Sequence, residues 1–228
     1  MRILIYAILL TIATNAFSQT TPQTVNSPNQ LIPSGYVVFN EIRGDLNKDN
    51  QEDFVFIIKG TDKENIVMDK YLGQLDRNPR GIIIAIKNKD KYELALENRH
   101  CFSSENEDGG VYYAPELDVS IEKGNLLFHY AHGRYGYWKY KFRYQYSDFE
   151  LIGYDSSQGR GPVEESFTSI NFMTKKMLVK VNVNQNAEGG DEIFKESWKS
   201  FSLSKPIKLR DIVLFDNLDV QSLLGHDK

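Results

Sequence analysis

The chain consists largely of short strand-forming segments separated by polar turns, and this pattern restricts it to an all-β fold. Residues 54–58 and 82–86 are continuous apolar runs, typical of central strands that are buried on both faces. Segments 117–121 and 126–130 flank Lys123-Gly124-Asn125, which is typical of a β-hairpin turn. We therefore expect antiparallel sheets built from hairpins, with about nine or ten strands in a sandwich-like or incomplete-propeller arrangement.

Residues 138–146 form the clearest strand pattern. Aromatic side chains occupy every second position, namely Trp138, Tyr140, Phe142, Tyr144 and Tyr146. Basic side chains lie between them, namely Lys139, Lys141 and Arg143. Because side chains alternate across a strand, one face is aromatic and the other is basic. The aromatic face indicates a core position, and the alternative is an exposed platform that binds sugar rings.

Helical patterns are few. Met68, Tyr71, Leu72 and Leu75 share one face of a short predicted helix, although Gly73 interrupts it. Residues 209–224 predict a second short helix. The expected fold is therefore all-β with few short helices.

The segment 44–53, just before the first apolar run, has the spacing of a cation-binding loop. Oxygen-bearing side chains fall at alternate positions: Asp45, Asn47, Asp49, Gln51 and Asp53. Calcium binds roughly 6–8 oxygens at about 2.3–2.6 Å, and alternate residues of a curled loop supply them. We expect side-chain oxygens from four of these residues and the backbone carbonyl from Gln51. The alternative is a solvated acidic turn without metal.

Two well-known calcium loops are excluded by the residue at position 12, counted with Asp45 as position 1. An EF-hand requires a bidentate Glu there, and a dockerin-type loop requires an acid, but the chain has Phe56. Residues 44–49 and 53–56 instead resemble the FG-GAP (VCBS-like) repeat, the calcium loop of integrin-type β-propeller blades. The chain contains one copy and carries Asn50 where the repeat has glycine, so the resemblance implies a calcium loop and not a complete propeller. A closed set of protein oxygens favours a structural role for the ion.

The N-terminus has the pattern of a secretory signal peptide. Arg2 precedes an apolar run at 3–13, and small residues at 16 and 18 suit cleavage before Gln19. We therefore predict a signal peptide at 1–18, a disordered polar leader at 19–34 and a single β-rich domain at 35–228, secreted or periplasmic. No other apolar run is long enough for a membrane span. The net charge of −4 argues against a nucleic-acid partner.

Candidate catalytic groups do not form a recognisable set in the sequence. Glu105, Glu107 and Asp108 lie in one acidic loop, and His129 and His132 could complete a hydrolase site for glycans or peptides. The single Cys101 cannot form an internal disulfide, and its pairing with a histidine in zinc or thiol chemistry is less favoured than simple packing.

The leading hypothesis is a secreted, calcium-stabilised binding or interaction module for an unknown protein or glycan ligand, and not an enzyme. The alternatives are a periplasmic or secreted hydrolase and a carbohydrate-binding module, the latter requiring that the aromatic side chains of 138–146 be accessible.

Overall fold

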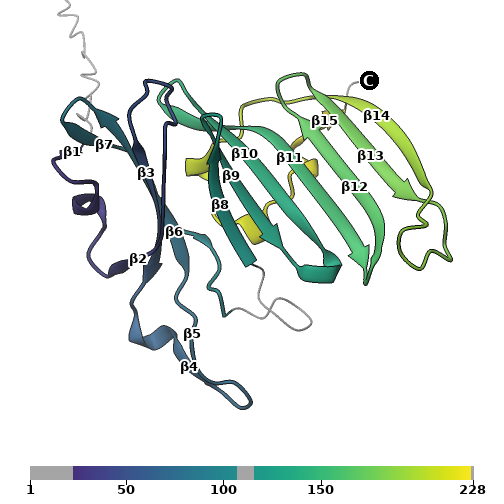
Figure 1. Cartoon of the computed structure of the whole chain (residues 1–228), viewed down its shortest axis with the longest axis horizontal. Helices are drawn as coiled ribbons and strands as arrows, with labels where there is room; N and C mark the ends of the chain where they lie inside the picture. The colour runs from purple at the N-terminus through teal and green to yellow at the C-terminus, as the bar shows by residue number, and fades with distance from the viewer. Residues whose placement is uncertain (1–22, 107–115, 227–228) are drawn as a thin grey trace, which may run out of the picture.

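The computed structural model describes residues 23–106 and 116–226. Two antiparallel sheets form the body, a two-stranded hairpin projects from it, and neither sheet closes into a barrel (Figure 1). The helical turns among the described residues are all short 3-10 turns. The prediction of an all-β, antiparallel, hairpin-built fold is confirmed. No described helix has the length and apolar character needed to cross a bilayer.

The smaller sheet has the strand order β1-β7-β6-β3-β2. Its strands are β1 (Thr24–Val25), β2 (Tyr36–Gly44), β3 (Asp53–Gly60), β6 (Arg80–Asn88) and β7 (Lys91–Phe102). The two predicted apolar runs form its central strands, β3 and β6, and alternate side chains of each enter different buried clusters on the two faces. These strands are apolar throughout because both faces of the sheet are covered.

Part of the N-terminal leader covers the outer face of this sheet, so the prediction of disorder was wrong for residues 23–34. β1 pairs with β7, and a 3-10 turn, η1 (Pro28–Leu31), follows it. The Gln30 side-chain oxygen accepts the backbone N–H groups of Asn26 and Ser27 at 3.1 Å each. Leu31 is buried in the outer cluster beside β3. Residues 1–22, with the predicted signal peptide, lie outside the described part.

The larger sheet is a meander in which each strand pairs with the next along the chain, in the order β15 to β8. The predicted hairpins are therefore present. Its strands are β8 (Glu116–Glu122), β9 (Asn125–Ala131), β10 (Gly136–Gln145), β11 (Asp148–Arg160), β12 (Val163–Asn171), β13 (Lys176–Asn182), β14 (Phe194–Ser202) and the short β15 (Gly225–His226).

The aromatic face of β10 points into the core shared by the two sheets. Tyr140 and Phe142 are buried there, while Trp138 and Tyr144 are half-buried against the same cluster. Tyr146 departs from the predicted pattern: it lies beyond the strand with a φ of 52° and is 90% exposed. Most of this face is therefore core and not an open platform.

Residues 203–226 run back across the large sheet and do not form the predicted helix. Figure 1 shows this segment behind strands β10 to β12. It contains three 3-10 turns, η4 (Leu209–Asp211), η5 (Phe215–Asn217) and η6 (Gln221–Leu223). Asp219 favours a turn over a continuous helix because its Oδ1 accepts the N–H groups of Gln221 and Ser222.

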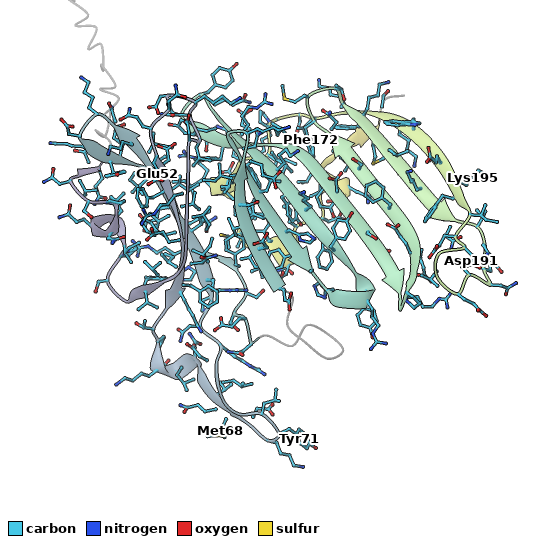
Figure 2. The ribbon with its side chains drawn as sticks, viewed as in Figure 1. Glu52, Met68, Tyr71, Phe172, Asp191 and Lys195 are labelled. Carbon is cyan, nitrogen blue, oxygen red and sulfur yellow. The ribbon has the colours of Figure 1, made fainter. Side chains whose placement is uncertain are left out.

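The helix predicted from Met68 to Leu75 is also wrong, because residues 66–76 form a projecting β-hairpin. Its strands are β4 (Ile66–Asp69) and β5 (Gly73–Asp76). The turn depends on Asp69, whose Oδ1 accepts the N–H groups of Tyr71 (2.7 Å) and Leu72 (2.9 Å), and on Gly73 with a φ of 78°. Figure 2 shows Met68 and Tyr71 at its far end, and both are exposed.

A buried carboxylate attaches the C-terminal segment to the turn between β10 and β11. Asp148 accepts a hydrogen bond from Arg210 Nε at 2.8 Å and pairs with Lys208 Nζ at 3.1 Å. Burial alone would raise the pKa of Asp148, but these two cations outweigh burial and lower it.

The lowered pKa of Asp148 makes stability depend on pH in a defined direction. A carboxyl group whose pKa is lower in the folded state stabilises the fold above its unfolded value of about 3.9 and loses this contribution as the pH falls through the folded value. We expect Asp148→Asn to flatten the fall in unfolding free energy between about pH 5 and pH 2, measured by urea denaturation. Asp211→Asn, an exposed neighbour, is the control. Equal acid slopes for wild type and Asp148→Asn would contradict this assignment.

Candidate metal centre

The predicted cation loop lies at the seam between the two sheets. It connects β2 to β3, and Figure 2 shows its residue Glu52 at the end of the molecule away from the β4–β5 hairpin. Leu46 is 1% exposed and belongs to the core shared by both sheets. A Cβ on Gly124, in the β8–β9 turn, would come within 2.8 Å of the Lys48 side chain. The loop therefore contacts the large sheet as well as the small one.

Asp53 is the most buried of the predicted ligands, with 0% exposure. Its Oδ2 accepts the N–H of Leu46 at 2.8 Å, inside the loop. Its Oδ1 accepts the N–H of Lys87, near the end of β6, also at 2.8 Å. The carboxylate thus ties the loop to the first residue of β3 and to the neighbouring strand.

Asp45 organises the first half of the loop. Its Oδ1 accepts the N–H groups of Lys48 (2.6 Å) and Asp49 (3.1 Å), and its Oδ2 accepts that of Asn50 (2.9 Å). Lys48 and Asn50 adopt left-handed backbone conformations, with φ values of 66° and 63°. Asn tolerates this conformation better than most residues, which explains its presence where similar loops have glycine.

Asn47, Asp49 and Gln51 are neighbours in the second half of the loop. The side-chain amides of Asn47 and Gln51 both donate to Asp49 Oδ2, at 3.0 and 3.1 Å. Asp49 Oδ1 accepts the backbone N–H of Gln51 at 2.8 Å. All five predicted residues therefore lie in one curled loop. Within the described ranges, however, no three His, Cys, Asp or Glu side chains gather closely enough to form a metal site by themselves.

The carboxylates of Asp45, Asp49 and Asp53 concentrate negative charge in this loop. Burial raises the pKa of Asp53, and the negative charges of Asp49 and Asp45 raise it further, while the two backbone N–H groups oppose this. The pKa of Asp49 is lowered, first by the backbone N–H of Gln51 and then by the Asn47 amide. In the described part of the chain no Lys or Arg forms an ion pair with the carboxylates at 45, 49 and 53. A bound cation would supply the missing positive charge.

The hydrogen bonds in the loop are compatible with a cation. An ionised carboxylate has two oxygens with about four lone-pair sites, so an oxygen that accepts one N–H still has capacity for a metal. The side chains of Asp45, Asn47, Asp49 and Asp53 and the carbonyl of Gln51 remain the residues that could hold calcium. The contact with Lys87 had no signal in the sequence, because it joins residues 34 positions apart.

The candidate catalytic residues have other roles where they are described. Glu105 forms an ion pair with the buried Lys59, which also pairs with Asp76 at 2.8 Å. His129 packs on the ring of Tyr137 and His132 on that of Trp138. Glu107 and Asp108 lie outside the described residues. No contact found within those residues joins Glu105 to either histidine.

Cys101 is buried in the core, with its thiol 3.8 Å from the carbonyl oxygen of Asn98. Burial raises the pKa of this thiol, the opposite of what a reactive cysteine requires. Its position favours packing over thiol chemistry.

The chain was compared with protein-family models, with curated proteins and with solved structures, and no match was found in any of the three.

Proposed function

We propose that this protein is a secreted or periplasmic binding module that is stabilised by calcium held in the 45–53 loop. The observation that carries the proposal is Asp53, a fully buried carboxylate that receives two backbone N–H groups and has Asp45 and Asp49 as its charged neighbours. A buried charge that lacks an oppositely charged partner is costly, and a dication removes that cost.

The position of the loop supports a structural role for the ion. The loop joins β2 to β3 and contacts the β8–β9 turn, so an ion that fixes its conformation would stabilise the seam between the sheets. Binding to the folded state alone raises stability by mass action. A role in binding, for a protein or glycan partner, fits the secretion signal that the N-terminal sequence predicts.

Calcium titration is the direct test of this proposal. We expect calcium to raise the melting temperature over that in a chelator, and to add about 2.7 kcal/mol of stability at a free concentration of about 100 times Kd. Isothermal titration calorimetry should give a single site. The Asp49→Ala variant should lose this response, because an exposed ligand is removed without disturbing the core.

Glu52→Ala is the matched control. Glu52 is an exposed acid in the same loop, it pairs with Arg43 at 3.7 Å, and it falls outside the alternating set. The variant loses the same charge and should keep the full calcium response. Equal melting temperatures in calcium and chelator for the wild type, or equal losses in the two variants, would overturn the proposal.

A further inference from the structure

A second feature, remote from the loop in sequence, is a polar pocket of about 290 Å³ between the large sheet and the C-terminal segment. Its sheet side includes Trp138 on β10 and Ser156 and Gln158 on β11. Its other side is formed by residues 216–221, around η5 and η6. In Figure 1 the strands and this segment lie one behind the other. The volume is just below the range of about 300–1,000 Å³ that is typical of small-molecule sites.

The pocket combines a fixed aromatic ring with polar groups that have no hydrogen-bond partner among the described residues. Trp138 is half-buried, and the ring of His132 packs edge-on against it at 4.5 Å between centroids. Trp138 Nε1 and the side-chain amides of Gln158, Asn217 and Gln221 make no hydrogen bond within the described ranges. Amides of this kind offer donors and acceptors to a ligand at once.

The charge of the lining selects among ligands. Asp216 and Asp219 contribute carboxylates, and no Lys or Arg is among the described lining residues. Burial lowers the pKa of the adjacent His132, against an opposing effect of Asp216, which favours the uncharged imidazole. Phosphates, sulfates and uronic acids would meet only negative charge, and large apolar ligands would leave the amides unsatisfied.

We infer that this pocket binds a neutral saccharide, one or two pyranose rings in size. A sugar ring has an apolar C–H face that packs on an indole, and hydroxyl groups that both donate to carboxylates and exchange hydrogen bonds with amides. Asp219 is prepared for this role: its Oδ1 is held by two backbone N–H groups, and its Oδ2 accepts no hydrogen bond from another described residue. The inference extends the proposed binding role but does not depend on the calcium loop.

The chain offers an internal reporter for the test. It contains two tryptophans, Trp138 in the pocket and Trp198 on β14, which is 66% exposed and is not among the pocket residues. In the Trp198→Phe variant, the fluorescence therefore comes from Trp138 alone. Neutral sugars (glucose, galactose, mannose, N-acetylglucosamine and their disaccharides) should shift this emission saturably. The same sugars should not change the tryptophan emission of the Trp138→Phe variant, because its only tryptophan is Trp198, outside the pocket.

Affinity is then measured by calorimetry on the full chain. Trp138→Ala should weaken binding by about tenfold or more, the effect of removing an aromatic anchor. Asn217→Ala should weaken it by about threefold to tenfold, the loss of one hydrogen bond. Asn217 is exposed and its side chain has no partner among the described residues, so this variant should keep the wild-type melting temperature. Trp198→Ala is the matched control and should bind normally.

Three results would overturn the inference: no neutral sugar binds, only glucuronate or galacturonate binds, or binding survives Trp138→Ala. Failure of the calcium proposal gives a different result. In that case calcium does not change the stability of the wild type or of Asp49→Ala, while the responses of Trp138 to sugar are unchanged.

Discussion

Replacing Phe215 with alanine is expected to lower the free energy of unfolding by about 3–5 kcal/mol, the range for removing a buried phenylalanine. Phe215 is 3% exposed and stacks on Phe102 with 5.0 Å between ring centroids. It also contacts the rings of Tyr140 (4.9 Å) and Phe128 (5.3 Å). One side chain of the C-terminal segment thus fills a space lined by both sheets, and a cavity there removes contacts to each.

The control for Phe215 lies two residues away. Val213 belongs to the same segment but is 86% exposed, so Val213→Ala should change stability by no more than about 0.5 kcal/mol. Urea denaturation, followed by circular dichroism, measures both variants. Phe215→Ala should also loosen the segment that forms one side of the polar pocket. If the two variants were equally stable, the packing of residues 203–226 against the core would be refuted.

The second large effect is expected at Asp53. In the presence of a chelator, Asp53→Ala should lower the free energy of unfolding by about 2–5 kcal/mol, because the N–H groups of Leu46 and Lys87 then lose their acceptor. This loss of stability comes from the protein alone and does not depend on a bound metal.

The Asp49→Ala variant separates the contribution of the protein's own hydrogen bonds from the contribution of bound calcium. Asp49 is exposed, and the hydrogen bonds of its side chain are all with residues 47 and 51 of the loop, so in chelator its replacement should cost about 1 kcal/mol or less. With calcium present, both variants should lack the added stability. If Asp53→Ala in chelator were as stable as Asp49→Ala, Asp53 would not be the structural anchor described here.

Local sequence patterns were reliable where one short segment carried the information. The apolar runs at 54–58 and 82–86 became β3 and β6, and the alternation at 138–144 became the core face of β10. The alternation of side chains along a strand and the short polar turn between two strands are both short-range properties. Each can therefore be recognised in the sequence without knowing the partner strand. The curled loop around Asp45 belongs to the same class, since its hydrogen bonds span five residues or fewer.

The incorrect predictions concern segments whose structure depends on distant residues. Residues 66–76 have a helical spacing of apolar side chains, but Asp69 and Gly73 form a turn and the hairpin exposes Met68 and Tyr71. The polar leader has too few apolar residues to fold by itself, yet Leu31 covers an apolar surface made by β3 and β6. In both cases the tertiary or turn interaction outweighs a weak local preference.

The amino-acid sequence by itself determined the central strands β3 and β6, the alternating core strand β10, the β8–β9 hairpin and the loop with alternate oxygen-bearing side chains, because each depends on residues close together in the chain. Only the tertiary structure decided that Asp53 contacts Lys87, that Phe215 enters the core, and that Trp138 faces residues 216–221 across a pocket. These contacts join residues from 34 to 113 positions apart, and such pairs are selected by the burial of apolar surface and the satisfaction of buried polar groups in the complete fold.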